Sequence, residues 1–460
     1  MTERVDAIIL GMGVGGEEVA ECLAQNGLTV VGIENHLVGG ECAYYGCIPT
    51  KMMIRADDML AEGRRIPRFA GDSTVTPDWD PVARRIRKEA TDDWDDRVAV
   101  ERFEKKGGRF VRGAGRLAGP GKVSVNGTTY EATRAVVIST GTSPAIPPIP
   151  GLSEVKYWTN REAVKVEQLP ASLVILGGGA IGVELSQVFA RFGVKVAIIE
   201  GMNRVLAIEE PEASAVLATV LERDGIELYL NVHAKSVEPR GDAVTVNLDD
   251  GRHVTGDRLL VATGRRANLN EIGLETVGLD PSARFLEPDD HLRVGQRLWA
   301  IGDVTANGGF THMAIYHADI VINEILGNPV PGADYRAKPR VTFTDPEVGA
   351  AGMTEEQARK NGIKVRTGLQ KASVTSRGWI HGPGNDGLIK VVEDADHGVL
   401  IGATTMGPRG GDILGIFELA IKMQIPSDEL RHLIYAYPTF YRGAGEAVRK
   451  LGPDVHLPLR

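Results

Sequence analysis

Two stretches of the chain, residues 5–34 and 171–200, repeat one pattern of hydrophobic and polar positions. Each begins with a short run of apolar residues, which predicts a buried strand. A glycine-rich turn follows, then a segment with apolar residues at helical spacing, a glycine, and a second apolar run that ends in glutamate. The pattern predicts two βαβ units of the kind that bind dinucleotides.

The turn in each unit has the spacing GxGxxG. Glycine allows a tight turn and a close approach of the backbone to a pyrophosphate, and the following helix N-terminus offers unpaired N–H groups. The glutamate that ends the second strand is expected to accept hydrogen bonds from an adenosine ribose. Glycines that serve only helix–strand packing are the alternative. The residues concerned are Gly11, Gly13, Gly16 and Glu34 in the first unit, and Gly177, Gly179, Gly182 and Glu200 in the second.

Each unit is followed by a second signature, a β-branched strand that stops at Thr-Gly, in residues 135–144 and 258–267. After about residue 334 the pattern changes to alternating strands of an antiparallel sheet, followed by helices near 410–424 and 440–450. This order predicts an α/β fold with two Rossmann-like nucleotide-binding domains and a C-terminal α+β domain.

Composition narrows the classes of function. A chain of 460 residues is expected to form two to four domains, and its net charge of −9 argues against a nucleic-acid partner. No apolar run is long enough for a membrane span, and the N-terminus reads as a strand rather than a leader, so we expect a cytoplasmic protein. The heavily charged, mostly helical segment from Ile48 to about Lys106 is expected to face solvent.

The sequence CAYYGC holds two of the three cysteines, Cys42 and Cys47. Pro49 suits the first turn of a helix, which places Cys47 near a helix N-terminus, where the helix dipole lowers a thiol pKa. We therefore expect a redox-active disulfide in which Cys47 is the buried thiolate and Cys42, in the preceding loop, is the exposed thiol that attacks an acceptor. A half zinc site and two unpaired core cysteines are the alternatives, and Cys22 is expected to be an unreactive helix thiol.

The first unit runs directly into the cysteine pair, so it is expected to hold the cofactor that exchanges electrons with sulfur. FAD suits this role, because a flavin accepts hydride on one face and donates to sulfur from the other. The second unit is then expected to bind the nicotinamide. Glu200 repels a 2′-phosphate, which favours NADH over NADPH.

With these motifs the chain resembles the class I pyridine nucleotide–disulfide oxidoreductases, which include dihydrolipoamide dehydrogenase, glutathione reductase and mercuric reductase. The resemblance extends over essentially the whole length, through GGxCxxxGCIPTK, AIGDV, FTHMA and FTDPEVGAAGMTEE. It implies a homodimer whose C-terminal domain completes the partner's disulfide site. It also implies four segments, which are 1–147 (FAD-binding), 148–267 (NAD(P)-binding), 268–334 (the second part of the FAD-binding domain) and 335–460 (dimerisation).

The resemblance also implies roles for further residues. Lys51 is expected near the flavin, paired with Glu184, although a helix-surface charge is the alternative. His312 is expected near the flavin, with a structural histidine as the alternative. The remaining implied cofactor-binding residues are Gly115, Thr140, Gly141, Gly264, Gly302 and Asp303.

One departure bears on the reaction. Disulfide reductases of this family carry a His-Pro-Thr motif followed by a glutamate, whereas this chain reads YAYPTFYRGAGE, with Tyr437 and Arg442 at the two positions. A histidine exchanges a proton near neutral pH, and a tyrosine hydroxyl does not, so Tyr437 is expected to act as a hydrogen-bond donor. Packing of the tyrosines at the dimer interface is the alternative.

These observations predict an enzyme, an FAD-dependent NAD(P)H oxidoreductase that passes electrons through Cys42–Cys47 to a small-molecule acceptor. Two classes of acceptor stay open: a small disulfide, or a quinone, oxygen, metal or other electrophile. A mercuric-type activity has less support, because mercuric reductase uses a C-terminal cysteine pair that the segment GPDVHLPLR does not contain. The lipoamide dehydrogenase subunit of a 2-oxoacid complex is disfavoured, because its turnover needs fast thiol proton transfer. The alternative that is not an enzyme is a flavin-bearing redox sensor with little turnover.

Overall fold

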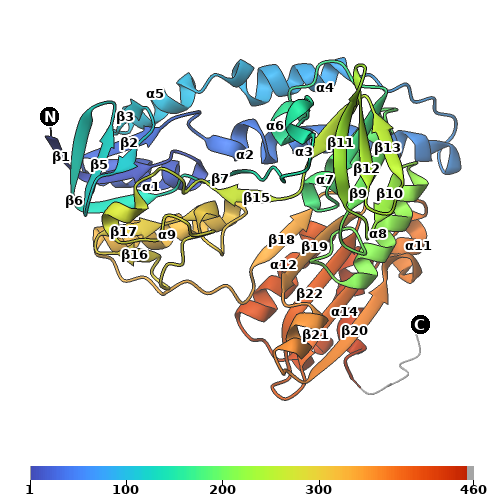
Figure 1. Cartoon of the computed structure of the whole chain (residues 1–460). Helices are drawn as coiled ribbons and strands as arrows, with labels where there is room; N and C mark the ends of the chain where they lie inside the picture. The colour runs from blue at the N-terminus through green and yellow to red at the C-terminus, as the bar shows by residue number, and fades with distance from the viewer. Residues whose placement is uncertain (1, 453–460) are drawn as a thin grey trace.

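The computed structural model describes residues 2–452, and the three largest of the five sheets in these residues organise it (Figure 1). The first sheet lies at the N-terminal end, the second follows it in the chain, and the third is built from the C-terminal residues. The predicted fold class is confirmed. The domain boundaries stay predictions, and the end of the last predicted segment, 453–460, lies outside the described residues.

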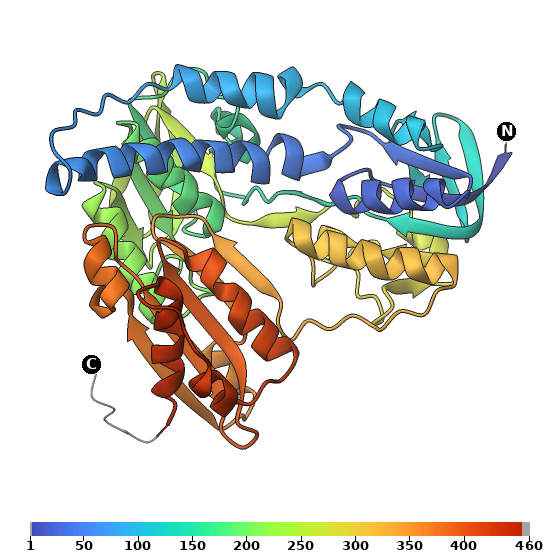
Figure 2. The same ribbon diagram turned by 180° about the vertical axis from the view of Figure 1, so that it is seen from behind.

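The first sheet is mostly parallel and contains the first predicted βαβ unit: β1 (Thr2–Leu10), α1 (Val14–Gln25) and β2 (Val30–Glu34). Strand β6 (Thr128–Ile138) pairs with the other side of β1, in parallel. Strand β17 (Leu298–Ala300) then pairs with β6, so the chain returns to this sheet after the second unit. Helix α9 (Thr311–Leu326) packs beside α1 (Figure 2).

The second sheet has the strand order β10-β9-β8-β14 and contains the second βαβ unit. Strand β8 (Ser172–Leu176), α7 (Ala180–Arg191) and β9 (Lys195–Glu200) repeat the layout of the first unit. Strands β10 (Glu227–Leu230) and β14 (Arg258–Val261) extend the sheet in parallel on either side. Residues 148–267 thus include a complete nucleotide-binding sheet.

The third sheet is antiparallel, as the alternating pattern predicts, with the order β18-β19-β22-β21-β20. Its strands are β18 (Pro339–Thr342), β19 (Glu347–Gly352), β20 (Val365–Lys371), β21 (Leu388–Asp394) and β22 (Val399–Gly407). Helices α12 (Gly410–Lys422) and α14 (Phe440–Arg449) follow at the predicted places and bury Phe417, Ala444 and Val448 against the sheet.

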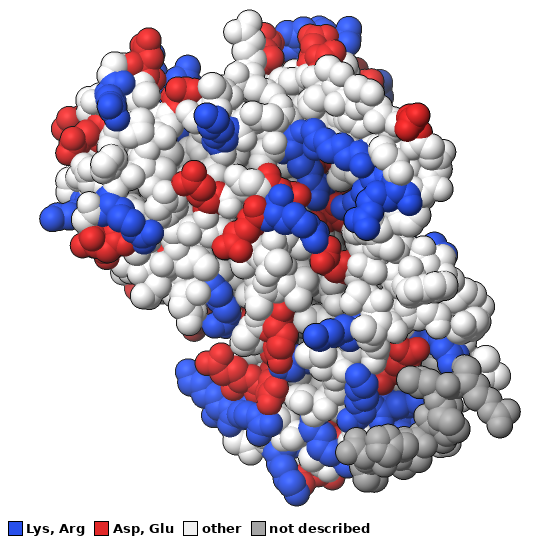
Figure 3. All heavy atoms as spheres, turned by 90° about the vertical axis from the view of Figure 1, so that its right-hand side faces the viewer, with Lys and Arg blue, Asp and Glu red and all other residues white. Residues whose placement is uncertain are grey.

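The charged segment after Cys47 begins with α3 (Cys47–Arg65), a long helix that runs from the first domain alongside the other two (Figure 2). The expectation that its charges face solvent is wrong for Asp57, whose exposed fraction is 2%. Asp57 is covered because the face of α3 that carries it packs against α7. Elsewhere on the molecule, acidic and basic side chains are mixed over the face drawn in Figure 3. None of the helices in residues 2–452 has the length and apolar character of a membrane span.

Candidate active site

A cavity of about 1410 Å³ connects the two nucleotide-binding units. Its wall includes the glycine turn of each unit, at Gly13 and Gly179, and the cysteine pair lies between them. Because the space is continuous, two dinucleotides bound on the two turns can extend toward each other. The three features that the sequence singled out therefore share one site.

The first glycine turn is shaped to receive a pyrophosphate. A Cβ added at Gly13 meets no atom within 4 Å, whereas one at Gly16 would lie 2.1 Å from the Gly11 carbonyl oxygen. Helix α1 has no side-chain cap at Gly13, so its first N–H groups are free to bind an anion. The Glu34 carboxylate closes the turn, because it accepts hydrogen bonds from the N–H groups of Met12 (2.8 Å) and His36 (2.8 Å). These residues fit the adenosine diphosphate half of FAD.

The second glycine turn repeats this geometry. A Cβ at Gly179 meets open space, and one at Gly182 would lie 2.0 Å from the Gly177 carbonyl oxygen. The Glu200 carboxylate accepts from the N–H groups of Gly178 (2.5 Å) and Met202 (2.7 Å). The carboxylate thus stands at the end of β9, where the ribose of a bound nicotinamide dinucleotide is expected.

Asp303 reaches the same cavity from the returning segment. Its Oδ2 accepts from the Thr142 hydroxyl (2.8 Å) and its Oδ1 from the Gly309 N–H (3.0 Å). Gly302 has a φ of +69°, a conformation that glycine adopts readily. Its N–H donates to Nδ1 of the buried His317 (3.1 Å), and burial lowers the pKa of His317 to about 4, so this imidazole is a neutral acceptor.

Cys47 is the first residue of α3, as Pro49 in the first turn predicts. Cys42, in contrast, lies on a short helix, α2 (Gly40–Tyr44), and not in a loop, because Gly39 starts a helical turn from a φ of +104°. The two residues are separate thiols, and both are partly buried. The expected difference between an exposed Cys42 and a buried Cys47 is therefore not found.

The environment of the two thiols does distinguish them. A hydrogen bond from Cys42 lowers the pKa of Cys47 to about 6; the Thr311 hydroxyl, 3.3 Å away, and the Lys51 charge act in the same direction. The same hydrogen bond, together with burial, raises the pKa of Cys42. The reduced pair therefore holds one proton on Cys42 and a thiolate at Cys47 near neutral pH.

Lys51 lies one helical turn after Cys47 and faces the cavity. Its Nζ is 2.8 Å from Glu184 Oε2 on α7, and it also lies 4.7 Å from the centre of the Phe343 ring. The second oxygen of Glu184 accepts from the Phe343 N–H at 2.8 Å. The ion pair therefore joins the two nucleotide-binding domains, and the C-terminal domain, through Phe343, binds the other oxygen of the Glu184 carboxylate.

Glu41, the residue before Cys42, is a site residue that the sequence reasoning missed. Its carboxylate accepts from Arg161 (2.7 Å), Arg265 (3.0 Å) and Asn160 (3.2 Å), all of which line the cavity. The redox helix α2 is thereby attached to the second domain. The only signal in the sequence was an acidic residue inside the cysteine motif. Its partners, Arg161 and Arg265, lie too far along the chain for a local sequence pattern to connect them with Glu41.

Most of the residues singled out in the sequence line the cavity. His312 does so while its Nε2 lies 3.0 Å from the Pro339 carbonyl oxygen, and burial lowers its pKa. Gly115 is not part of the described cavity wall, because it packs against Leu10 and Ile33. The residues in the wall are Gly13, Gly16, Glu34, Cys42, Cys47, Lys51, Thr140, Gly141, Gly177, Gly179, Glu184, Glu200, Gly264, Gly302, Asp303 and His312.

Tyr437 and Arg442 do not line this cavity in the described chain. Tyr437 is 65% exposed, and the Arg442 guanidinium lies 5.2 Å from the centre of its ring. Arg442 also lies 3.6 Å from Glu446, one turn further along α14. The pair is thus available to another surface rather than to the cysteines of its own chain.

Two family matches cover the described architecture. Residues 5–318 match the pyridine nucleotide-disulphide oxidoreductase family, and residues 338–448 match the dimerisation domain of that family. The chain belongs to the pyridine nucleotide-disulphide oxidoreductases. Members of this family use FAD and a pyridine nucleotide. This agrees with the two dinucleotide cradles, which are the glycine turns at Gly13 and Gly179 with their glutamates, in the cavity that the cysteines also line.

Individual relatives cover nearly the whole chain. A mercuric reductase from Streptomyces lividans is 31% identical over 98% of this chain and 97% of its own. A dihydrolipoyl dehydrogenase from Thermus scotoductus is 32% identical over 97% of both. The relatives therefore include more than one activity at nearly the same identity.

The solved structures give the same picture. LpdA from Mycobacterium tuberculosis superposes with a TM-score of 0.85 at 25% identity, covering 98% of this chain and 100% of that one. A Cu(II) complex of the HOCl-induced flavoprotein disulfide reductase RclA from Escherichia coli superposes with a TM-score of 0.84 at 25% identity, covering 96% and 99%.

Proposed function

We propose that this chain is an FAD-dependent NADH oxidoreductase that reduces a small-molecule disulfide through the Cys42–Cys47 pair. The observation that carries the proposal is the position of the two cysteines, with Lys51, in the wall of one cavity that also holds both dinucleotide cradles. The opposite pKa shifts of the two thiols agree with it. The first cradle, at Gly13 and Glu34, would hold FAD, which would supply the chemistry of accepting a hydride and passing an electron pair to sulfur.

The cysteines divide the work by their different proton affinities. The Cys42–Cys47 bond takes up an electron pair and a proton, leaving a thiol at Cys42 and a thiolate at Cys47. Cys42 passes its proton along its hydrogen bond to Cys47 as it attacks the acceptor disulfide, and one half of the acceptor leaves as a thiolate. That thiolate takes the proton from Cys47, which then attacks Cys42, releases the second half and restores the disulfide.

This route gives Cys47 the proton-holding role that a histidine has in other disulfide reductases. Tyr437 of a second copy of the chain, at the position of that histidine, would supply a hydrogen bond to the acceptor. Arg442 beside it supplies positive charge toward the leaving thiolate. Internal proton exchange is slower than exchange with a dedicated base, so we do not assign the chain to a 2-oxoacid dehydrogenase complex.

Glu200 supports NADH over NADPH. Its carboxylate is fixed by two backbone N–H groups at the ribose end of the second cradle. A 2′-phosphate there would meet this charge at short range. The nearby Arg204 donates instead to the Ala207 carbonyl oxygen at 2.9 Å.

We further propose that the active unit is a homodimer. The C-terminal half leaves large apolar side chains uncovered in the described chain, among them Trp379, Leu419, Met423 and the 92% exposed Ile434. Exposed apolar groups of this size are typical of surfaces covered by another chain. A second copy would bring its Tyr437 to the cysteines that the first copy's Tyr437 does not reach.

A second candidate function is direct reduction of a quinone or other electrophile in the cavity. The observation that favours it is Ala180, a small and exposed side chain in the cavity wall directly after Gly179. A methyl group leaves room there for an acceptor besides the nicotinamide.

One assay separates the two candidates. NADH-dependent turnover is measured with a small disulfide and with a quinone, using the native enzyme and Cys42→Ser. Disulfide turnover that falls at least about a hundredfold in Cys42→Ser supports the proposed function. Quinone turnover that survives the substitution, with no disulfide turnover in the native enzyme, contradicts it.

A further inference from the structure

Helices α3 and α7 are joined by two ion pairs, and only the first lies at the cavity. Both helices begin at the cavity wall, α3 at Cys47 and α7 at Ala180. Lys51 pairs with Glu184 about one turn after the start of each helix. Roughly two turns further along, Arg191 Nη1 lies 3.4 Å from both carboxylate oxygens of Asp57.

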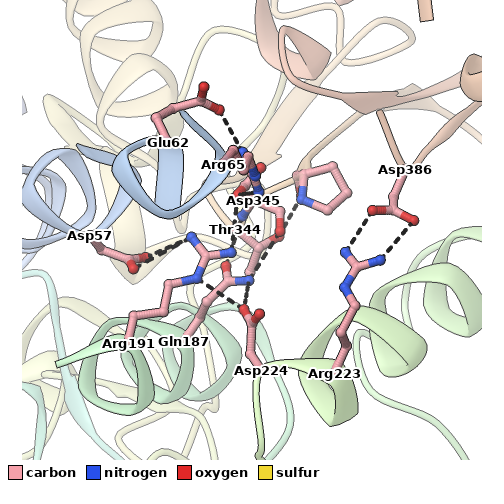
Figure 4. Close-up of polar contacts among 11 residues, drawn as sticks. Asp57, Glu62, Arg65, Gln187, Arg191, Arg223, Asp224, Thr344, Asp345 and Asp386 are labelled. Atoms are coloured by element: carbon pink, nitrogen blue, oxygen red, sulfur yellow. Dashed lines mark hydrogen bonds and ion pairs between the residues drawn. The ribbon is translucent and has the colours of Figure 1, made fainter. Parts of the chain in front are cut away.

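The second ion pair is buried and extends into the C-terminal domain (Figure 4). The Arg191 side chain is 5% exposed and contacts three carboxylates. Besides Asp57, it donates to Asp224 at 2.9 Å and to Asp345 at 3.0 Å. Arg65, at the end of α3, donates to the same oxygen of Asp345 at 2.5 Å.

A continuous set of contacts leads from Asp345 back to the active site. The Asp345 N–H donates to Gln187 Oε1 at 2.7 Å, and Gln187 Nε2 donates back to the Asp345 carbonyl oxygen at 3.0 Å. Two residues earlier, the Phe343 N–H donates to Glu184, and the Phe343 ring lies against Lys51. The segment 343–345 therefore fixes both members of the ion pair beside Cys47.

We propose that Arg191 is a positioning residue for this redox site. By holding Asp57 of α3 and Asp345 of the C-terminal domain against α7, it fixes Lys51 at the distance from Cys47 at which its charge stabilises the thiolate. The inference rests on the proposed function, since it assigns a purpose to the Cys47 thiolate.

The charge balance explains why one arginine has this effect. Burial raises the pKa of Asp57 to about 7 and of Asp58 to about 6, and Arg191 opposes both shifts. Without Arg191 the carboxylates at the junction would lose the charge that offsets their burial, and they would repel one another or take up protons. Either change removes the ionic contacts that hold α3 and segment 343–345 against α7. The charged and titratable groups that face Asp57, Asp58 and Asp345 are Arg55, Arg65, Arg191, Asp224, Glu347 and His381.

Arg191→Met tests the proposal, because methionine keeps the apolar stem and removes the charge. The reduced holoenzyme is alkylated with iodoacetamide across pH 5–9, and tandem mass spectrometry locates the adduct on Cys47. We expect the apparent pKa of Cys47 to rise by about one unit, so that alkylation below pH 6 slows about tenfold. The Michaelis constant for NADH is also expected to rise in Arg191→Met.

Arg223→Met is the matched control. Arg223 also joins the second domain to the C-terminal domain, through Asp386 at 2.6 Å, but it contacts neither Asp57 nor Asp345 (Figure 4). This variant should keep the parent profile. A folded Arg191→Met variant with the parent Cys47 profile would overturn the proposal.

Where Arg191→Met does not fold, Asp345→Asn decides, because asparagine keeps the shape and removes the charge that Arg191 holds. A raised Cys47 pKa in this variant supports the proposal, and an unchanged one overturns it. If Cys47 in the parent enzyme shows no lowered pKa at all, the proposed function fails, whatever the variants do.

Discussion

The Cys47 sulfur lies 3.3 Å from the Thr311 hydroxyl, which comes from the start of α9, 264 positions along the chain. The contact brings the start of α3 against the returning segment of the FAD-binding fold. It also gives the thiolate a hydrogen bond from a fixed donor. The charge on Cys47 is therefore maintained from three sides, by Cys42, Thr311 and Lys51.

The first prediction concerns this contact. Thr311→Val removes the donor while keeping the shape, so the Cys47 pKa should rise from about 6 by about one unit. The pH dependence of alkylation in the reduced enzyme measures this shift. Thr311→Ser keeps the hydroxyl and should behave as the parent. Equal alkylation profiles for the valine and serine variants would show that the Thr311 hydroxyl does not lower the Cys47 pKa.

The second prediction concerns Glu41, which holds Arg161 and Arg265 beside the cysteine pair. Glu41→Gln should lower the free energy of unfolding by about 1 kcal/mol, since the ion pairs are partly exposed and screened. It should also raise the Michaelis constant for NADH, because α2 is no longer attached to the second domain. Glu275→Gln, which breaks a surface pair with Arg116, is the control. An NADH constant that changes equally in both variants would count against the assigned role.

The third prediction concerns nicotinamide choice. Glu200→Gln removes the charge at the ribose end of the second cradle, so the preference in kcat/KM for NADH over NADPH should fall about tenfold. Steady-state assays with the two nucleotides measure this ratio. Glu34→Gln, at the matching position of the first unit, should weaken FAD retention and leave the ratio unchanged. A parent enzyme that prefers NADPH would contradict the assignment.

The fourth prediction concerns Tyr437. Tyr437→His restores a group that exchanges protons near neutral pH, so turnover of small disulfides should rise about tenfold or more. Arg442→Glu in the same chain should increase the gain, because a carboxylate orients the imidazole. Tyr437→Phe keeps the ring and serves as the control. A folded histidine variant without any gain would indicate that this position only packs at the interface.

The fifth prediction follows from the burial of Asp57. Its folded-state pKa of about 7 lies above the unfolded value, so its contribution to stability is complete below the unfolded pKa and is lost as pH rises through 7. Asp57→Asn removes this loss. The stability of the variant relative to the parent should therefore increase between about pH 4 and pH 7, as chemical denaturation would show. A pH-independent difference would mean that Asp57 does not titrate in this range.

Much of the fold could be predicted from the sequence because its signals are local. Each GxGxxG turn lies between a strand and a helix, so Gly13 and Gly179 could be placed before any contact was known. Pro49 likewise located the start of α3. The antiparallel C-terminal sheet followed from the alternation of apolar and polar residues in its strands.

The remaining site could not be predicted from local pattern because its partners are distant in the chain. Lys51 and Glu184 are 133 positions apart, and only the family resemblance joined them. Glu41 and Asp57 looked like ordinary surface acids, since nothing near them in the sequence shows which helix covers them. Their roles depend on the packing of three domains, which local spacing does not encode.

The most direct test of the account is anaerobic titration of the holoenzyme with NADH. A flavin and a disulfide together store twice the reducing equivalents that the flavin stores alone, so we predict that full reduction exceeds the capacity of the flavin and exposes two new thiols, Cys42 and Cys47. Uptake limited to the flavin, with no new thiols, would contradict the transfer of electrons to sulfur.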